Sequence, residues 1–215
     1  MEPLHILEDP SFCVPAVPTD CPPGTVGWLR ASVARFSEGA AHERRRDLAT
    51  AALATAPPDL LRREAAARAT AGNTDRLAVD VLAAALGVTA DVFPAVAAIA
   101  AVYQPHTGGY PGAADTAVAA LVEIFGGTCD EATAARIGLL VQACDATAAL
   151  IREAHAGAAP ADAAPVPATR RVSPVDGSTV VVPLAASGLP FGAGRHACPG
   201  RAHALAIAEG ACHAG

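Results

Sequence analysis

The sequence predicts a mainly α-helical protein with one small β element. Segments with helical apolar periodicity fill most of the 215 residues, and clusters of Pro and Gly separate them. Apolar residues make up 52% of the chain and aromatic residues only 4%, so Ala, Val and Leu must build most of the core. The run VDGSTVVVP, residues 175–183, departs from the helical pattern, and its Asp-Gly pair followed by valines is typical of a hairpin.

The predicted helices follow one another with short breaks. Residues 1–27 hold a helical turn and then many prolines, so we expect an irregular N-terminal segment there. A helical pattern extends from Trp28 to about Ala56, with a break at Gly39 and a second helix from near His42. The remaining expectations are helices over 59–72, 73–87, 90–102, 113–125, 130–155 and 201–212, loops over 104–112 and 188–200, and an Ala/Pro linker over 156–169. The length favours a single domain, residues 1–215.

Charge and cysteine usage exclude several classes of function. The formal net charge is −6, which gives no basic face for nucleic acid. The N-terminus has no apolar signal core, and polar residues interrupt the apolar runs, so we expect a cytoplasmic protein with no membrane partner. The 6 cysteines form no CxxC pair. We therefore expect reduced thiols rather than disulfides or a zinc site.

The run FGAGRHACPG, residues 191–200, carries the clearest chemistry. It resembles the heme-binding signature of the cytochrome P-450 family, Phe-Gly-x-Gly-x-His-x-Cys-x-Gly, at every fixed position. The resemblance implies that the Cys198 thiolate is the axial ligand of heme b (iron protoporphyrin IX), where a thiolate favours O–O cleavage. Gly192 and Gly200 would let the backbone pass close to the porphyrin, and Phe191 would keep water from the sulfur. The expected fold class is a shortened cytochrome P-450-like helical heme domain, with residues 188–200 as the heme-ligand loop.

Basic residues far from this loop extend the resemblance. His42 and Arg46 stand four residues apart, and on one helix face they would form a two-donor clamp for a carboxylate. Their region resembles the His-x-x-x-Arg segment of the family, which implies that they hold a heme propionate. Arg171 stands where the family has a strand arginine for the other propionate, and His196 is implied as a further partner. The alternative for His42 is an ordinary surface residue of a helix.

Residues 139–148, LLVQACDATA, resemble the distal helix of the family, which carries Ala-Gly-x-acid-Thr. Thr147 matches the threonine that relays protons, and the alternative is an ordinary helix-interior threonine. Cys144 replaces the glycine and Ala146 replaces the acid. The carboxylate stands one place earlier, at Asp145, which rotates it by about 100° around the helix. Thr147 and Asp145 are the candidate catalytic residues, and Asp145 is alternatively a structural residue.

Other parts of the family pattern are missing. The chain has about half the usual length of the family, with no evident Glu-x-x-Arg helix, N-terminal sheet, lid helices or long meander before the signature. These parts form the substrate cover and much of the face for redox partners. Their absence would leave apolar surface, so we also expect a homodimer.

Three functions follow from the resemblance. The first is a minimal heme-thiolate oxidoreductase of monooxygenase or peroxygenase type, acting on a small organic or carrier-bound substrate in specialised metabolism. It would use an external electron donor or peroxide, because the sequence holds no flavin or nicotinamide motif. The second is a heme-thiolate enzyme with non-oxygenative chemistry: dehydration, isomerisation or N–heteroatom rearrangement. The third is a non-catalytic heme sensor or helper protein.

Overall fold

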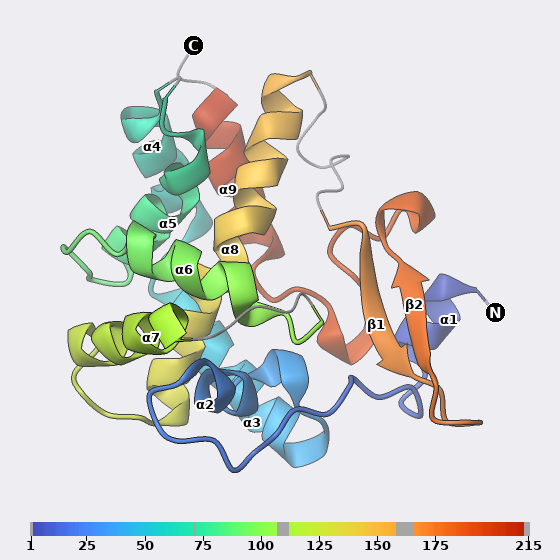
Figure 1. Ribbon diagram of the computed structural model, residues 1–215. Coiled ribbons are helices and arrows are strands. Elements are labelled where there is room, and N and C mark those ends of the chain that lie inside the picture. Colours follow the sequence, from blue (N-terminus) through green and yellow to red (C-terminus); the bar gives the residue numbers. More distant parts are fainter. Residues whose placement is uncertain (1, 71, 107–111, 158–165, 213–215) are drawn as a thin grey trace.

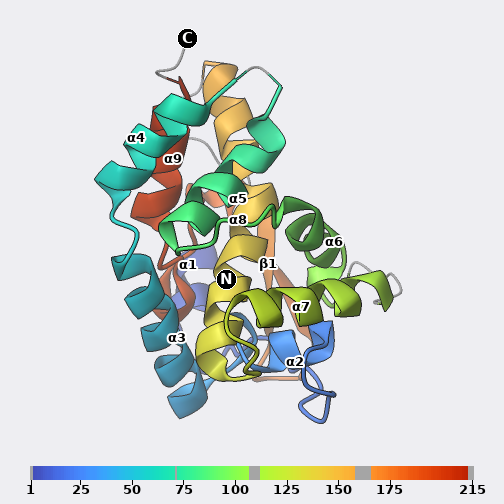
Figure 2. The same cartoon turned by 90° about the vertical axis from the view of Figure 1, so that its left-hand side faces the viewer.

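The protein is mainly helical, as the sequence predicts, and its helices surround one long central helix (Figures 1 and 2). The computed structural model describes residues 2–70, 72–106, 112–157 and 166–212. Its helices are α1 (Pro3–Glu8), α2 (Val26–Ala31), α3 (Gly39–Ala54), α4 (Pro58–Arg68), α5 (Thr74–Ala85), α6 (Phe93–Tyr103), α7 (Gly112–Ile124), α8 (Glu131–His155) and α9 (Arg201–Cys212). The strands are β1 (Ala168–Val172) and β2 (Thr179–Pro183).

The central helix is α8, which the other helices flank along its length. It begins where the sequence predicts, because the Asp130 side chain accepts a hydrogen bond from the Thr133 N–H at 2.7 Å and caps the helix. In Figure 1, α4, α5 and α9 pack near its C-terminal end, and α2 and α3 lie near its N-terminal end. By length and composition α8 could cross a membrane, but 61% of its apolar window is buried inside the protein. That burial is typical of the core helix of a folded domain.

Helices α4 and α9 approach each other closely because small residues face across their contact. A Cβ added at Gly210 of α9 would overlap the Arg62 carbonyl oxygen of α4. Glycine at this position therefore brings the two backbones together. This contact anchors the C-terminal helix that follows the Cys198 loop.

The β element is an antiparallel hairpin, as predicted, and it stands with α1 to one side of the helices (Figure 1). Arg171 pairs with Val180 and Arg170 with Val181. The alternation of a strand turns Arg171 inward, where it is buried, whereas Val181 on the other face is exposed. A small apolar cluster joins α1 to β2: Ile6, Leu7, Phe12, Val182 and Leu184.

Some predicted boundaries are wrong. The break in the first helical stretch comes before Gly39, because Ser37 donates to the Val33 carbonyl at 3.0 Å and ends a 3₁₀ turn over Ala34–Phe36. Helix α3 therefore starts at Gly39 rather than near His42, and α2 already starts at Val26 within the predicted irregular segment 1–27. The predicted linker 156–169 overlaps β1, which begins at Ala168; residues 158–165 of that linker lie outside the described residues. Residues 107–111 of the predicted loop 104–112 also lie outside them.

Candidate functional site

The loop that carries Cys198 is fixed by backbone hydrogen bonds and by one arginine of α3. The Cys198 N–H donates to the Phe191 carbonyl at 2.9 Å, and the Ala197 N–H donates to the Gly194 carbonyl at 3.0 Å. Arg46 donates from Nη1 to the Ala197 carbonyl at 2.8 Å. This contact places a predicted propionate residue directly beside the predicted iron ligand.

The N-terminal helix α1 packs against the same loop at Gly194. This glycine has φ +65°, and a Cβ added there would overlap the Leu7 carbonyl oxygen and lie 3.1 Å from the Leu7 carbonyl carbon. Only glycine combines this backbone conformation with so close an approach. Gly192, the other glycine of the signature before Cys198, also has a positive φ, +69°. Gly200 lies at the sulfur, because a Cβ built there would be 4.0 Å from Cys198 Sγ.

Cys198 is an exposed residue as a whole, although protein surrounds much of its thiol. Desolvation by the surrounding protein raises the pKa of the thiol, while the Gly200 N–H and the charges of Arg46 and Arg35 act in the opposite direction. The surrounding protein therefore favours the neutral thiol, and the N–H and the two arginines favour the thiolate.

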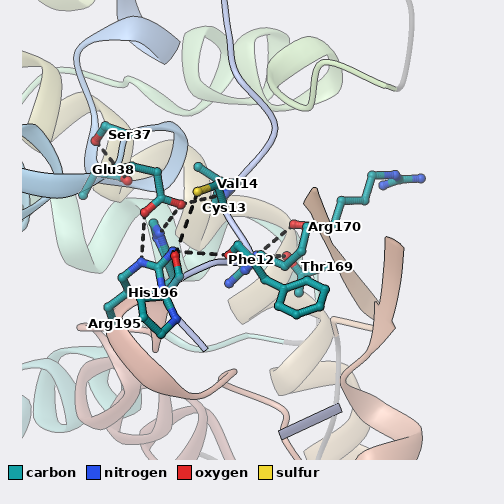
Figure 3. Close-up of polar contacts among 12 residues, drawn as sticks. Phe12, Cys13, Val14, Ser37, Glu38, Thr169, Arg170, Arg195 and His196 are labelled. Atoms are coloured by element: carbon teal, nitrogen blue, oxygen red, sulfur yellow. Dashed lines mark hydrogen bonds and ion pairs between the residues drawn. The ribbon is translucent and has the colours of Figure 1, made fainter. Parts of the chain in front are cut away.

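Glu38, which precedes α3, connects the Cys198 loop to the N-terminal segment (Figure 3). Its carboxylate accepts hydrogen bonds from the Val14 N–H at 2.6 Å and from Arg195 Nε at 2.9 Å, and it lies 3.2 Å from His196 Nε2. Burial acts to raise the pKa of Glu38, but the Arg195 and Val14 hydrogen bonds, together with the charges of His196 in its protonated form and of Arg195, hold it below its ordinary value. Arg195 also donates to the carbonyls of Asp9, Pro10 and Phe12.

The two predicted histidines meet beside Glu38. The ring centroids of His42 and His196 are 4.2 Å apart. Burial lowers the pKa of His196 to about 4, and the charge of Glu38 opposes this shift. Burial and the charge of Arg46 also lower the pKa of His42. Both rings are therefore neutral at pH 7, and His196 directs its Nε2 at Glu38.

Arg171 completes the group of predicted propionate residues. It is buried at 4% exposure, and its Nη1 donates to the Arg170 carbonyl at 2.8 Å and to Thr169 Oγ1 at 3.3 Å. Burial lowers its pKa, against the opposing charge of Glu38. No ion pair of Arg171 with a carboxylate occurs within the described ranges. The structure thus brings Arg46 to the Cys198 loop and places His42 and Arg171 near His196 of the same loop.

On α8, the two candidate catalytic residues point in different directions. Thr147 is buried at 4% exposure, whereas Asp145 is exposed. They differ by two residues, or about 200° around the helix. Cys144 is buried as well, and burial raises the pKa of its thiol to about 11, with the charges of Asp145 and Asp75 acting in the same direction. In the described part of the chain, no hydrogen bond or ion pair joins Thr147 or Asp145 to the Cys198 loop.

Sequence reasoning missed Glu38, Arg195 and Arg35. Glu38 and Arg195 stand 157 positions apart, so no local pattern reveals their pairing. Arg35 is half-buried in the 3₁₀ turn before α3, and its Nε is buried with no hydrogen-bond partner among the described residues. In the sequence, only the arginines close to His42 indicated that more basic residues belong to this site.

The arrangement of helices, hairpin and cysteine loop defines a cytochrome P-450-like fold. A similar solved structure is that of P450BioI in complex with acyl carrier protein ligated to hexadec-9Z-enoic acid. It superposes with a TM-score of 0.75 at 16% sequence identity, over 98% of this chain and 81% of the other. A scan of protein-family models finds no match. A search of curated proteins also finds no match.

Proposed function

We propose that this protein is a heme-thiolate oxidoreductase of the monooxygenase or peroxygenase type. The observation that carries the proposal is Cys198 in an intact Phe-Gly-x-Gly-x-His-x-Cys-x-Gly run, on a loop that precedes α9 of a cytochrome P-450-like fold. A free cysteine on an exposed residue, with Arg46 and Arg35 close enough to favour its thiolate, fits a ligand to iron.

The basic residues around the loop fit the two carboxylates of a heme. Arg46, Arg171 and Arg195 lie in a region with two histidines, and the carboxylate of Glu38 there is held by Arg195 and His196. Glu43 and Asp47 line the same pocket as His42, Arg46 and Arg195. Arg171 in particular is a buried guanidinium with only neutral acceptors within the described ranges. Buried charges are stable when they are paired, and propionates would pair them. We assign Arg46 and Arg171 as the principal propionate residues, with His42 beside Arg46.

The bound heme would supply redox chemistry at iron, with the thiolate increasing its electron density. The protein's own residues would set the state of the sulfur. The Gly200 N–H and the charges of Arg46 and Arg35 favour the thiolate, and the hydrogen bonds of the loop hold its direction. Phe191 packs on the core, with the Arg201 guanidinium 5.3 Å from its ring centroid. Thr147 is the proposed proton-relay hydroxyl.

A second candidate function drops oxygen activation. It is favoured by the exposure of Asp145 and by Ala146 at the position of the family's acid, because α8 then presents no carboxylate for proton delivery next to Thr147. Dehydration, isomerisation or N–heteroatom rearrangement needs no proton for O–O cleavage, and the one proton that a dehydration places on its leaving hydroxyl can come from the substrate or from water. Turnover without oxygen, reductant or peroxide would favour this function over the first.

The proposed substrate is a small organic molecule, free or carrier-bound, and an external electron donor or peroxide is the proposed co-reactant. The similar structure, P450BioI, is a complex with a fatty-acyl carrier protein, and this supports a carrier-bound substrate as one of the two classes. We further propose a cytoplasmic location and a homodimer.

The experiment compares heme content and turnover in the wild type, Cys198→Ala and Cys212→Ala. Cys212 is a matched control, since it is also a free, exposed thiol. We expect loss of thiolate ligation and of turnover in Cys198→Ala alone. Equal heme ligation and turnover in all three proteins would overturn the proposal.

A further inference from the structure

Two arginines before α3, Arg30 and Arg35, reach the C-terminal end of α6. They differ in the number of hydrogen bonds that their guanidinium groups donate. Arg30 donates from Nε to the Tyr103 carbonyl at 2.9 Å and from Nη2 to the Val102 carbonyl. These are carbonyls of the last helical turn, which lack partners within the helix. Arg30 is therefore a structural cap of α6.

Arg35 has no comparable set of acceptors. Its one hydrogen bond among the described residues runs from Nη2 to the neutral Gln104 Oε1 at 3.2 Å. Its Nε is buried with no partner in the described part of the chain, and desolvation lowers the pKa of the guanidinium. A buried guanidinium with a single neutral acceptor is costly for the folded state. Such a cost is typical of a residue kept for binding rather than for stability.

The hydrogen-bonding capacity that Arg35 leaves unused lies on one particular edge of its guanidinium. Nε and Nη2 together form the edge that binds a carboxylate side-on through two parallel hydrogen bonds. Two other arginines of this protein use that edge on carboxylates. Arg44 holds Glu131 at 2.7 and 2.8 Å, and Arg76 holds Asp80 at 2.7 and 3.2 Å. In Arg35, the Gln104 oxygen contacts only Nη2.

A second buried donor lies at the same junction. Tyr103 is 2% exposed, and its hydroxyl has no partner among the described residues. Its ring packs edge-on against Phe36, the neighbour of Arg35, with centroids 5.4 Å apart. The hydroxyl lies over α8 at Gly138, where an added Cβ would be 3.8 Å from Tyr103 Oη. Gly138 lies on α8, the helix that also carries the candidate catalytic residue Thr147, which stands nine residues or about 13.5 Å further along.

We propose that Arg35 and Tyr103 bind the carboxylate of the substrate, which makes the substrate class a small free organic acid. The side-on edge of Arg35 binds both carboxylate oxygens, with Gln104 displaced from Nη2, and the Tyr103 hydroxyl donates a further hydrogen bond. A carrier thioester offers no negative charge at that carbon and is not bound there. The role in substrate selection rests on the proposed function, but the binding of an acid does not require heme.

The test is calorimetric titration of the protein with octanoate and 3-phenylpropanoate, each compared with its neutral amide, and with the octanoyl thioester of N-acetylcysteamine. We expect the wild type to bind the acids about tenfold more tightly than the amides and the thioester, because the charged pair contributes at least one strong hydrogen bond. Arg35→Gln abolishes the preference, and Tyr103→Phe reduces it by a few-fold. Equal affinities for acid and amide in the wild type, or no binding of either acid, would overturn the proposal.

Thermal unfolding of the ligand-free proteins separates a binding role from a structural one. Arg30→Gln is the matched control, since it removes a cap and lowers Tm, whereas Arg35→Gln removes an unpaired buried charge and leaves Tm unchanged or higher. A Tm loss in Arg35→Gln equal to that in Arg30→Gln would contradict the inference.

Heme titration distinguishes this inference from the proposed function. If the protein takes up no heme but binds octanoate through Arg35, the proposed function fails and this inference stands. If Arg35→Gln weakens heme binding but leaves the affinity for octanoate unchanged, Arg35 is a propionate residue and this inference fails.

Discussion

Replacing Glu38 with Gln should loosen the Cys198 loop without removing any predicted heme contact. The carboxylate holds the Val14 N–H, Arg195 and His196 at 2.6, 2.9 and 3.2 Å. A carboxamide keeps one acceptor oxygen and turns an NH₂ donor toward the remaining donors. Because Oε1 faces Val14 and His196 and Oε2 faces Arg195, the carboxamide loses the bonds of one of these two sides and the negative charge that strengthens the rest. Since the Glu38 side chain is 28% exposed, the loss comes to about 2–3 kcal/mol.

For a chain of this size such a loss lowers Tm by about 5–10 °C. The assay is thermal unfolding, with heme titration in parallel, and we expect the heme affinity of Glu38→Gln to fall as well. Glu43→Gln is the control, because Glu43 is an exposed carboxylate of α3, five residues after Glu38. The reasoning is refuted if Glu38→Gln and Glu43→Gln have the same Tm and heme affinity.

Two further predictions concern the same loop. First, the free energy of unfolding should fall as pH drops from about 6.5 toward 4. Burial lowers the pKa of His196 to about 4, so the unfolded chain binds more protons than the folded one in that window. Urea unfolding across pH measures this, and the same slope of unfolding free energy against pH in His196→Gln would argue against it. Second, Gly194→Ala should cost at least about 2 kcal/mol of unfolding free energy. Gly188→Ala supplies the comparison: it has the same φ of +65° with nothing within 4 Å, so an equal loss would show that the contact with Leu7 is unimportant.

Local sequence patterns were sufficient to predict most of the helices and the hairpin. Apolar periodicity located α5 to α9, and the Asp130 cap and the Pro and Gly breaks placed their ends within a few residues. The predicted start of α3 was wrong, because apolar periodicity does not show a local side-chain hydrogen bond. Ser37 donates to the Val33 carbonyl and ends a 3₁₀ turn just before α3.

The candidate site was only partly predictable, for a physical reason. Cys198, His42, Arg46 and Arg171 stand in recognisable local patterns. Glu38 and Arg35, by contrast, act through partners brought together by the tertiary fold, such as Arg195 and Tyr103, and neither has a motif of its own. The rotation of Asp145 away from Thr147 could be foreseen from helix geometry, and its exposure agrees with that geometry.

The most direct test of heme-thiolate ligation is the absorption spectrum of the reduced, heme-loaded protein with CO. We predict a strongly red-shifted Soret band, typical of thiolate ligation, in the wild type and in Cys212→Ala, and its loss in Cys198→Ala. A wild-type Soret band typical of imidazole ligation, or a thiolate-type band that persists in Cys198→Ala, would contradict the assignment of Cys198 as the iron ligand.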